Sequence, residues 1–407
     1  MTKLALSQIG DIHYYILRNL KLDIFLNDKE DTVITKLQKY VLTLFIIGIV
    51  QTFAILQVTS YDPADPFEEK AMHWGISLNM TCFLIKFIRI ISNIGLFKSL
   101  FIDFERMNCN QHRSDYAREV LTKAIDFCKK IDKNCMYFMV FIYLVWFLVP
   151  ALLSPFVVLV NQEEMTYDSI TSHLPTTFSF KVNSPFREIR YVFESVNCFV
   201  ATALLQSANL SFFVIVYMLQ TQFMVLCDSV KRRHDLTSND DKEPLALKKL
   251  IKDHVTLLRI SKNLKEFLSP LLMVQLLDSV FLIGCIGSSL TSTPTTKDAS
   301  LIDVLANFVQ FASFLCLALA ELFMYCWLSH ITNESNQKLA SAIFENSDWY
   351  VNLGGKRDLV LTILLSQRDT SFRALDMVGI NLFRFLDVVR LSYSYFTMVK
   401  QFAKGEE

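Results

Sequence analysis

The sequence predicts an all-α membrane protein with seven transmembrane helices. Seven segments of the 407-residue chain are apolar over the roughly 20 residues that a spanning helix needs. Lys and Arg are concentrated in alternate connecting segments, with 24 on one side of the membrane and 5 on the other. The apolar runs are too long for barrel strands, which read as alternating segments of about ten residues. Helices are the other structure that satisfies every backbone hydrogen bond in lipid.

The predicted spans differ in length and continuity. The fourth, with its charged continuation, exceeds 30 residues and overruns a bilayer. Residues 244–265 carry apolar side chains at helical spacing, which predicts an amphipathic helix that leads into the fifth span or, alternatively, lies on the membrane surface. The seventh is broken into a short piece at 357–367 and a longer piece at 374–402. The first six are expected at about 40–59, 73–98, 135–160, 193–226, 266–290 and 301–331.

The distribution of positive charge predicts the orientation. The Lys- and Arg-rich segments belong in the cytoplasm, so the N-terminus is expected inside and, with seven spans, the C-terminus outside. A G-protein-coupled receptor has the opposite orientation, which disfavours that class. The expected parts are a cytoplasmic segment at 1–39, helices 1–6 at 40–331 with cytosolic extensions at 99–134 and 227–265, a cytosolic anchor with the inner part of helix 7 at 332–369, the outer part at 370–402, and an extracellular tail at 403–407.

Charge and residue content argue against several other functions. The 40 Lys and Arg balance 40 Asp and Glu, whereas a nucleic-acid-binding protein needs a basic excess. The nine Cys and seven His show no spacing typical of a metal site. No nucleophile, base and carboxylate combination is recognisable. We therefore expect neither an enzyme nor a cofactor-dependent protein, and no nucleic-acid partner.

The C-terminal quarter carries the most specific motifs. The run Ser392-Tyr393-Ser394-Tyr395-Phe396-Thr397 resembles the seventh-helix signature of insect odorant receptors. Trp349-Tyr350, followed by a short apolar helix and Gln367-Arg368, resembles the same family. Asp369-Thr370 departs from the family pattern, because many members carry a proline shortly after the pair that corresponds to Gln367-Arg368. Ser394-Tyr395, five residues and Gln401-Phe402 also resemble the ending of insect gustatory receptors, although Ser-Tyr-Phe-Thr favours the odorant branch.

The resemblance implies an odorant-gated, non-selective cation channel. The connection at 227–264 is short, whereas the co-receptor of the family (Orco) has a long one, so the chain is expected to be a tuning subunit in a heterotetramer with Orco. The implied location is the plasma membrane of olfactory sensory neuron dendrites, among membrane lipid and permeant cations. The implied ligand is a small volatile odorant, and an aromatic lining of the pocket favours an aromatic one. The alternatives are a gustatory-type homotetramer and a secondary transporter, although no internal repeat typical of transporters is found.

The resemblance also implies where the functional residues lie. The odorant pocket is expected in the outer half of helices 2–6, as an apolar and aromatic cavity with a few polar groups, and Pro150 is expected to kink the third span and open space. Because Phe is abundant, with 34 residues, any single Phe is more often a packing residue. The candidates are Trp74, Leu78, Thr81, Phe147, Ala151, Ser154, Asn197, Thr202, Phe308 and Phe311.

The last helix is expected to line the pore. Met398 and Phe402 are four residues apart and are predicted to form the gate, with Gln401 as a polar ring at the outer mouth. A helix face packed on its neighbours is the alternative. A cytosolic anchor is expected to hold the subunits together. Its candidate residues are Trp349, Tyr350, Leu359 and Ile363.

Charged residues within the spans are costly and often functional. Seven qualify. The three in the last span repeat at i, i+3 and i+6 and could pair within the helix, pair across subunits or line an aqueous vestibule, and a structural ion pair is the favoured interpretation. The sequence leaves the partners of all seven open. The seven are Lys86, Arg89, Asp278, Glu321, Arg384, Asp387 and Arg390.

Overall fold

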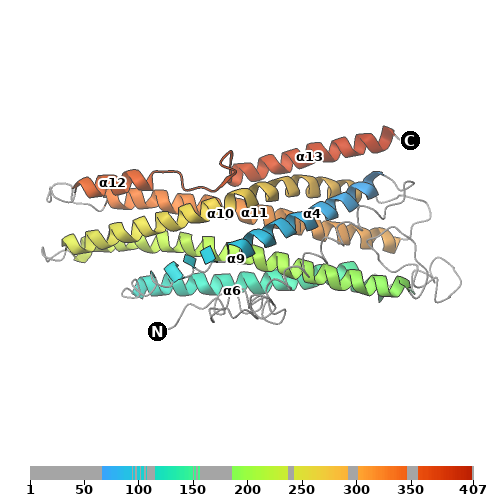
Figure 1. Cartoon of the computed structure of the whole chain (residues 1–407), viewed down its shortest axis with the longest axis horizontal. Coiled ribbons are helices and arrows are strands. Elements are labelled where there is room, and N and C mark those ends of the chain that lie inside the picture. The colour runs from blue at the N-terminus through green and yellow to red at the C-terminus, as the bar shows by residue number, and fades with distance from the viewer. Residues whose placement is uncertain are drawn as a thin grey trace.

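The computed structural model describes an elongated, almost entirely helical molecule (Figure 1). It describes residues 67–93, 115–149, 186–236, 243–291, 301–345 and 356–405, with scattered residues at 95–107 and 151–155. The predicted first span at 40–59 and the segment 1–39 lie outside these residues. The helices are α4 (Phe67–Ser92), α6 (Asp115–Tyr143), the π-helix η2 (Leu144–Leu148), α9 (Phe186–Leu236), α10 (Glu243–Thr291), α11 (Leu301–Glu345), α12 (Lys356–Ser366) and α13 (Leu382–Gly405).

The long helices run side by side along the length of the molecule (Figure 1). Helices α9, α10 and α11 form the centre, and α6 packs against α9 at one edge. Helices α12 and α13 follow one another along the opposite edge, where α12 packs on α11 and α13 on α10. Helix α4 crosses α10 obliquely and also contacts α9 and α13. Four helices therefore meet around α10.

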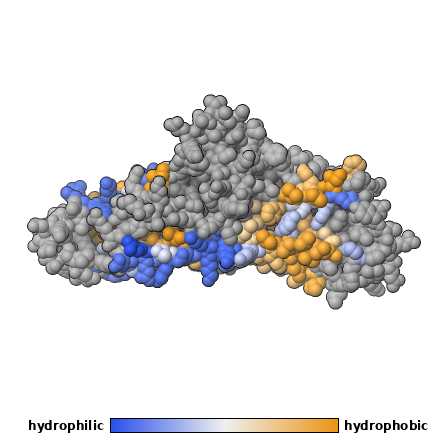
Figure 2. Space-filling view, turned by 90° about the horizontal axis from the view of Figure 1, so that it is seen from below, coloured by the Kyte–Doolittle hydropathy of each residue, from blue (hydrophilic) through white to orange (hydrophobic). Residues whose placement is uncertain are grey.

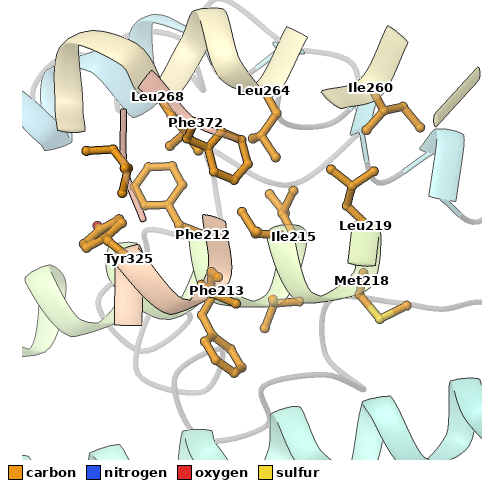
Figure 3. Close-up of a cluster of buried hydrophobic side chains, with 14 of the residues drawn as sticks. Phe212, Phe213, Ile215, Met218, Leu219, Ile260, Leu264, Leu268, Tyr325 and Phe372 are labelled. Carbon is orange, nitrogen blue, oxygen red and sulfur yellow. The ribbon is translucent and has the colours of Figure 1, made fainter. Parts of the chain in front are cut away.

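The best-packed part of the core lies where α9 faces α10 and α11. Ile215 and Leu219 of α9, and Leu257, Ile260 and Leu264 of α10, expose no surface. Figure 3 shows this cluster, with side chains of α9 and α10 interleaved. Such close packing makes the central helices a stiff frame, because protein interiors are packed as densely as organic crystals.

The surface separates into polar and apolar ends, as expected for a protein that is only partly in a membrane. On the face shown in Figure 2, hydrophobic surface gathers toward one end and hydrophilic surface toward the other. Along α6 the charged run ends at Lys133, and the exposed apolar side chains Tyr137, Phe141, Leu144 and Leu148 follow. Among the described residues, Asp115–Leu148, Ala208–Lys231, Lys248–Gly287 and Phe311–Glu345 are long and apolar enough to span a membrane.

The helical membrane fold is confirmed, and the main differences from prediction concern where helices end. Helix α6 begins at Asp115, within the predicted cytosolic extension at 99–134, and not near residue 135, where the third span was expected to start. Helix α11 continues to Glu345 instead of ending near 331. The predicted amphipathic helix at 244–265 is confirmed as the first half of α10. Hydropathy detects only the apolar part of a helix. It misses such ends because packing against other helices stabilises the helix beyond the point where its apolar content falls.

The break in the last helix is confirmed, but it is longer than predicted. Helix α13 begins at Leu382, not at 374, because the preceding residues form an antiparallel hairpin of β1 (Arg373–Ala374) and β2 (Val378–Gly379). The turn of this hairpin places Leu375 and Asp376 in the left-handed region, with φ of 47° and 57°. These are unusual conformations for residues other than glycine. The helix also reaches Gly405, within the predicted tail at 403–407.

Candidate functional site

An aromatic cluster surrounds the π-helix η2 and involves α6, α9 and α11. The indole ring of Trp146 meets Phe311 and Phe314 of α11 edge-on, with centroid distances of 6.0 and 5.6 Å. On the other side, Tyr143 lies 5.4 Å from Phe147 and 5.2 Å from Phe199 of α9. Edge-to-face arrangements are favourable for aromatic rings. The cluster thus gathers aromatic rings of the kind that predominate in small-molecule sites.

The polar groups of this cluster are few and differ in their partners. The hydroxyl oxygens of Tyr143 and Ser195 are 2.6 Å apart, and the Tyr191 hydroxyl donates to the backbone carbonyl of Phe147 over 2.8 Å. The Nε1–H of Trp146 is buried and has no hydrogen-bond partner among the described residues. An unsatisfied buried donor costs about 1–3 kcal/mol, so an acceptor placed beside this indole N–H would be stabilising.

The π-helix explains why these residues face one another. A π-helical turn contains extra residues, so it rotates the side chains that follow relative to a continuous α-helix. Leu144–Leu148 is such a turn, and it directs Trp146 toward α11 and Phe147 toward Tyr191 of α9. The predicted kink was assigned to Pro150, which lies outside the described residues. The irregularity in the described part of this helix precedes that proline.

The structure brings only some of the predicted pocket residues together. Phe147 and Phe311 both belong to the aromatic cluster, where Phe147 packs on Tyr143 and Phe311 packs on Trp146. Trp74, Leu78 and Phe308 are exposed on α4 and α11. Thr81 donates its hydroxyl to the carbonyl of Ser77 in its own helix. Two further candidates, Ala151 and Thr202, are half-buried. The last two, Ser154 and the side chain of Asn197, lie outside the described residues.

The sequence contained a signal for Tyr143 and Trp146, which the prediction missed although it included Phe147. Tyr143, Trp146 and Phe147 follow the i, i+3, i+4 spacing of one helical face. The prediction continued from Phe147 to 151 and 154 on a regular helix instead. Ser195 carries no local signal, because its role depends on the pairing of α6 with α9.

A second buried cluster lies where α4, α9, α10 and α11 meet, and it identifies the partners of two predicted intramembrane charges. The Lys86 ammonium pairs with Glu321 at 3.0 Å, and their side chains are 3% and 10% exposed. Asn209 donates its amide to the same carboxylate oxygen over 2.8 Å. The Tyr325 hydroxyl in turn donates to the Asn209 carbonyl oxygen over 2.9 Å. Lys86 also donates to the Gln275 amide oxygen.

Two further predicted charges lie beside this cluster. Asp278 accepts a hydrogen bond of 2.9 Å from the Asn79 amide, which joins α10 to α4. The Arg89 guanidinium lies 5.8 Å from the centroid of the Phe267 ring, a cation–π arrangement. The two contacts join helices but satisfy these charges only in part, because Asp278 Oδ1 and Arg89 Nε have no hydrogen-bond partner among the described residues. Among the described residues, no group of three or more His, Cys, Asp or Glu side chains has the arrangement of a metal site.

Helix α13 packs with one side and leaves the other exposed. Tyr395 stacks on Phe281 of α10 with a centroid distance of 5.1 Å, and it covers Gly284, where a Cβ atom would overlap its ring. The opposite side exposes Leu391, Ser394, Met398 and Gln401, which share one helical face. The Phe402 side chain lies outside the described residues.

The three charges of the last span form ion pairs within α13. Asp387 accepts from Arg384 at 3.2 Å and lies 3.9 Å from Arg390. The favoured interpretation of a structural ion pair is consistent with these distances. The predicted anchor residues Leu359 and Ile363 are half-buried on α12 and pack against the central core. Trp349 and Tyr350 lie outside the described residues.

Comparison with known proteins relates this architecture to olfactory receptors. The model of the family described as 7tm Odorant receptor matches residues 67–393. Odorant receptor 82a of Drosophila melanogaster is 24% identical over 229 residues, which are 56% of this chain and 57% of that protein. Putative odorant receptor 85d of the same species is 24% identical over 148 residues, 36% of this chain and 34% of the relative. The matches thus span little more than half of these relatives, or less.

The fold is also similar to a solved structure over almost the whole chain. The olfactory receptor OR5 from Machilis hrabei, in complex with eugenol, superposes with a TM-score of 0.71 at 14% identity. The similarity covers 97% of this chain and 99% of that one. The family model covers most of the sequence, and the fold agrees with it. The chain belongs to the seven-transmembrane odorant receptor family of insects.

Proposed function

We propose that this chain is the odorant-binding subunit of a heteromeric, ligand-gated, non-selective cation channel. Its partner is the odorant co-receptor Orco, and its location is the plasma membrane of olfactory sensory neuron dendrites, with the N-terminus in the cytoplasm. Family membership supports the channel activity. The connection between α9 and α10 supports a tuning subunit, because only residues 237–242 separate the two helices.

The aromatic cluster around η2 is the proposed odorant site. The observation that carries this assignment is the buried Nε1–H of Trp146, which has no partner among the described residues although aromatic rings surround it. A donor in this position selects ligands that have an apolar body and a hydrogen-bond acceptor. The Machilis hrabei receptor, whose structure holds eugenol, supports a volatile of this kind.

Helix α13 is the proposed pore-lining element. Met398 and Phe402 form the gate, and Gln401 forms a polar ring at the outer mouth. Met398 supports this assignment, because 46% of its side chain is exposed although it is apolar and belongs to a packed bundle. The exposed face formed with Leu391, Ser394 and Gln401 is available to line an axis shared by four subunits.

The experiment that tests the proposal is whole-cell recording from cells that express this chain with and without an insect co-receptor. The probes are eugenol and a panel of volatile alcohols, ketones, esters and hydrocarbons, without added GTP. We expect an inward cation current that needs both subunits. Odorant current without the co-receptor would instead favour a homomeric channel. A channel that opens with a co-receptor agonist but with no odorant of a broad panel would contradict the binding role.

Substituting Trp146→Phe tests the binding site within that experiment. The variant keeps an aromatic ring and loses the donor, so the half-maximal concentration of an acceptor-bearing odorant should rise about 5- to 10-fold, the equivalent of one hydrogen bond. A hydrocarbon odorant should shift much less. Trp327→Phe is the control, because that indole stacks on Phe213 and Tyr217 in the core. Equal shifts for both classes of odorant would remove Trp146 from the site.

A further inference from the structure

The break in the last helix creates backbone groups that no helix satisfies. Residues 367–381, here called the helix-7 break, separate α12 from α13 and pack between α10 and α11. Buried N–H and C=O groups need partners. A row of polar side chains on α11 supplies them, and we call this row the polar ladder. It consists of Ser329, Asn333 and Asn336, whose i, i+4, i+7 spacing places them on one helical face.

Ser329 holds both ends of the hairpin with a single hydroxyl group. Its Oγ accepts from the backbone N–H of Phe372 over 2.9 Å and donates to the carbonyl of Ile380 over 2.7 Å. The N–H of Ile380 donates back to the Phe372 carbonyl over 2.9 Å. Ser329 exposes no surface, so water does not compete for these bonds. The hydroxyl therefore joins the start and the end of the hairpin to α11.

The two asparagines bind the earlier part of the break in opposite chemical roles. The Oδ1 atom of Asn333 accepts from the backbone N–H and the hydroxyl of Thr370, over 2.8 and 3.1 Å. The Nδ2 atom of Asn336 donates to the carbonyls of Ser366 and Arg368, over 2.9 and 3.3 Å. Asn333 is thus an acceptor and Asn336 a donor. A substitution of the same type at both positions has different chemical consequences.

Other contacts hold the break on its remaining sides. The Phe372 side chain inserts into the core, where Figure 3 places it beside Phe212 of α9 and near Leu264 and Leu268 of α10. Lys265 of α10 donates to the Asp369 carbonyl over 2.9 Å. The break is therefore a packed and hydrogen-bonded junction. A junction of this kind can transmit a displacement of one helix to the next, whereas a loose loop would absorb it.

We propose that the polar ladder couples α11 to α13 during gating. Phe314 of the aromatic cluster and Ser329 lie on the same helix, separated by about 22 Å of helical rise. A ligand that displaces the outer part of α11 moves the ladder, and the ladder moves the base of α13. This inference rests on the proposed function, because it takes odorant binding at α11 and pore opening at α13 as given. The ladder residues position the pore helix and do not touch the odorant.

The paired asparagines make the proposal specific. Asn333→Asp keeps the acceptor oxygen that Thr370 uses, so coupling should persist. Asn336→Asp replaces the donor by a carboxylate that faces two carbonyl oxygens, so coupling should weaken. Ser329→Ala removes two bonds without adding charge and serves as a milder second variant. Thr332→Val is the matched control, because the Thr332 hydroxyl is buried on the same helix and donates to the Leu328 carbonyl within that helix, with no bond to the described residues of the break.

The test co-expresses each variant with the co-receptor and measures surface amount, the maximal current with eugenol and the volatile panel, and the current with a co-receptor agonist. For Asn336→Asp and Ser329→Ala, the ratio of odorant to agonist current should fall about fivefold or more, as the loss of one or two hydrogen bonds predicts. Asn333→Asp and Thr332→Val should keep the ratio of the unmodified chain. Equal ratios in all four variants at matched surface amounts would overturn the coupling role.

A second readout does not depend on the odorant. In the purified complex, amide hydrogen exchange across residues 369–381 should be faster in Ser329→Ala than in Thr332→Val, because the N–H of Phe372 loses its acceptor. Unchanged exchange would overturn the ladder itself. If the unmodified complex responds to the agonist and to no odorant, the proposed function fails, while the exchange result still decides whether the ladder holds the break.

Discussion

Two buried sites that share helix α11, the Lys86–Glu321 cluster and the surroundings of Trp146, differ in whether their polar groups have partners. Around Lys86 and Glu321, charged and polar side chains of four helices satisfy one another. Around Trp146, aromatic rings enclose a donor that no described residue satisfies. The first arrangement is what a structural junction needs, because unpaired buried charge is expensive. The second leaves an interaction for a ligand to complete. Burial alone therefore does not distinguish the two sites. What distinguishes the Lys86 ammonium from the Trp146 indole N–H is that only the former has acceptors among the described residues.

The largest expected effect comes from unpairing the charged junction. Glu321→Gln leaves the buried Lys86 without its counter-charge and should destabilise the protein by about 3–5 kcal/mol. Adding Lys86→Met should recover most of the loss, because the glutamine still accepts from Asn209. The measurement is the melting temperature of the detergent-solubilised protein, with surface amount in cells. Glu334→Gln is the control, since its pair with Lys338 is exposed on the same helix. A single variant as stable as the double would contradict the pairing.

An intermediate effect on stability is expected at the contact between α10 and α13. Gly284→Ala places a Cβ atom inside the Tyr395 ring and should cost about 1–3 kcal/mol, as overpacking usually does. Gly287→Ala meets Phe396 at an ordinary 3.6 Å, so the higher helix propensity of alanine should leave it neutral or stabilising. Melting temperatures of the two variants measure the difference. If Gly284→Ala were as stable as Gly287→Ala, the close contact with Tyr395 would be wrong.

The smallest effect is expected for the exposed ion pairs of α13. The Arg390 side chain is 80% exposed and lies 3.9 Å from Asp387, which Arg384 also contacts. Exposed pairs contribute little, so Arg390→Gln should change the free energy of unfolding by less than about 0.5 kcal/mol. The same melting assay, run beside Glu321→Gln, contrasts a buried pair with an exposed one. A loss as large as that of Glu321→Gln would mean that Arg390 is buried in the assembled protein.

The fold was largely predictable because lipid imposes a long apolar run on each spanning helix. That constraint identified α9 and the apolar parts of α10 and α11. It did not predict the start of α6 at Asp115 or the end of α11 at Glu345, since polar helices outside lipid are stabilised by packing. The hairpin after Ser366 was also missed. Its two-residue strands carry too little sequence pattern to distinguish them from a loop.

The candidate site was predictable only in part. Helix assignment and aromatic content were enough for Phe147 and Phe311. Trp146 was missed although it has helical spacing with Tyr143, because the prediction continued from Phe147 to residues 151 and 154 on a regular helix, whereas Leu144–Leu148 is a π-helix. The charges at Lys86 and Glu321 were recognised as costly, yet their pairing joins residues 235 positions apart and depends on tertiary structure. The gate residues Met398 and Phe402 and the anchor residues remain predictions.

The exposed side of α13 has a consequence for the stability of a single chain. A newly inserted single chain presents Arg390, Ser394 and Gln401 next to Leu391 and Met398 on a surface with no partner. Polar side chains that face hydrocarbon are costly. We therefore expect a single chain with this surface in lipid to be less stable than one in which water or a second protein surface covers the exposed side of α13.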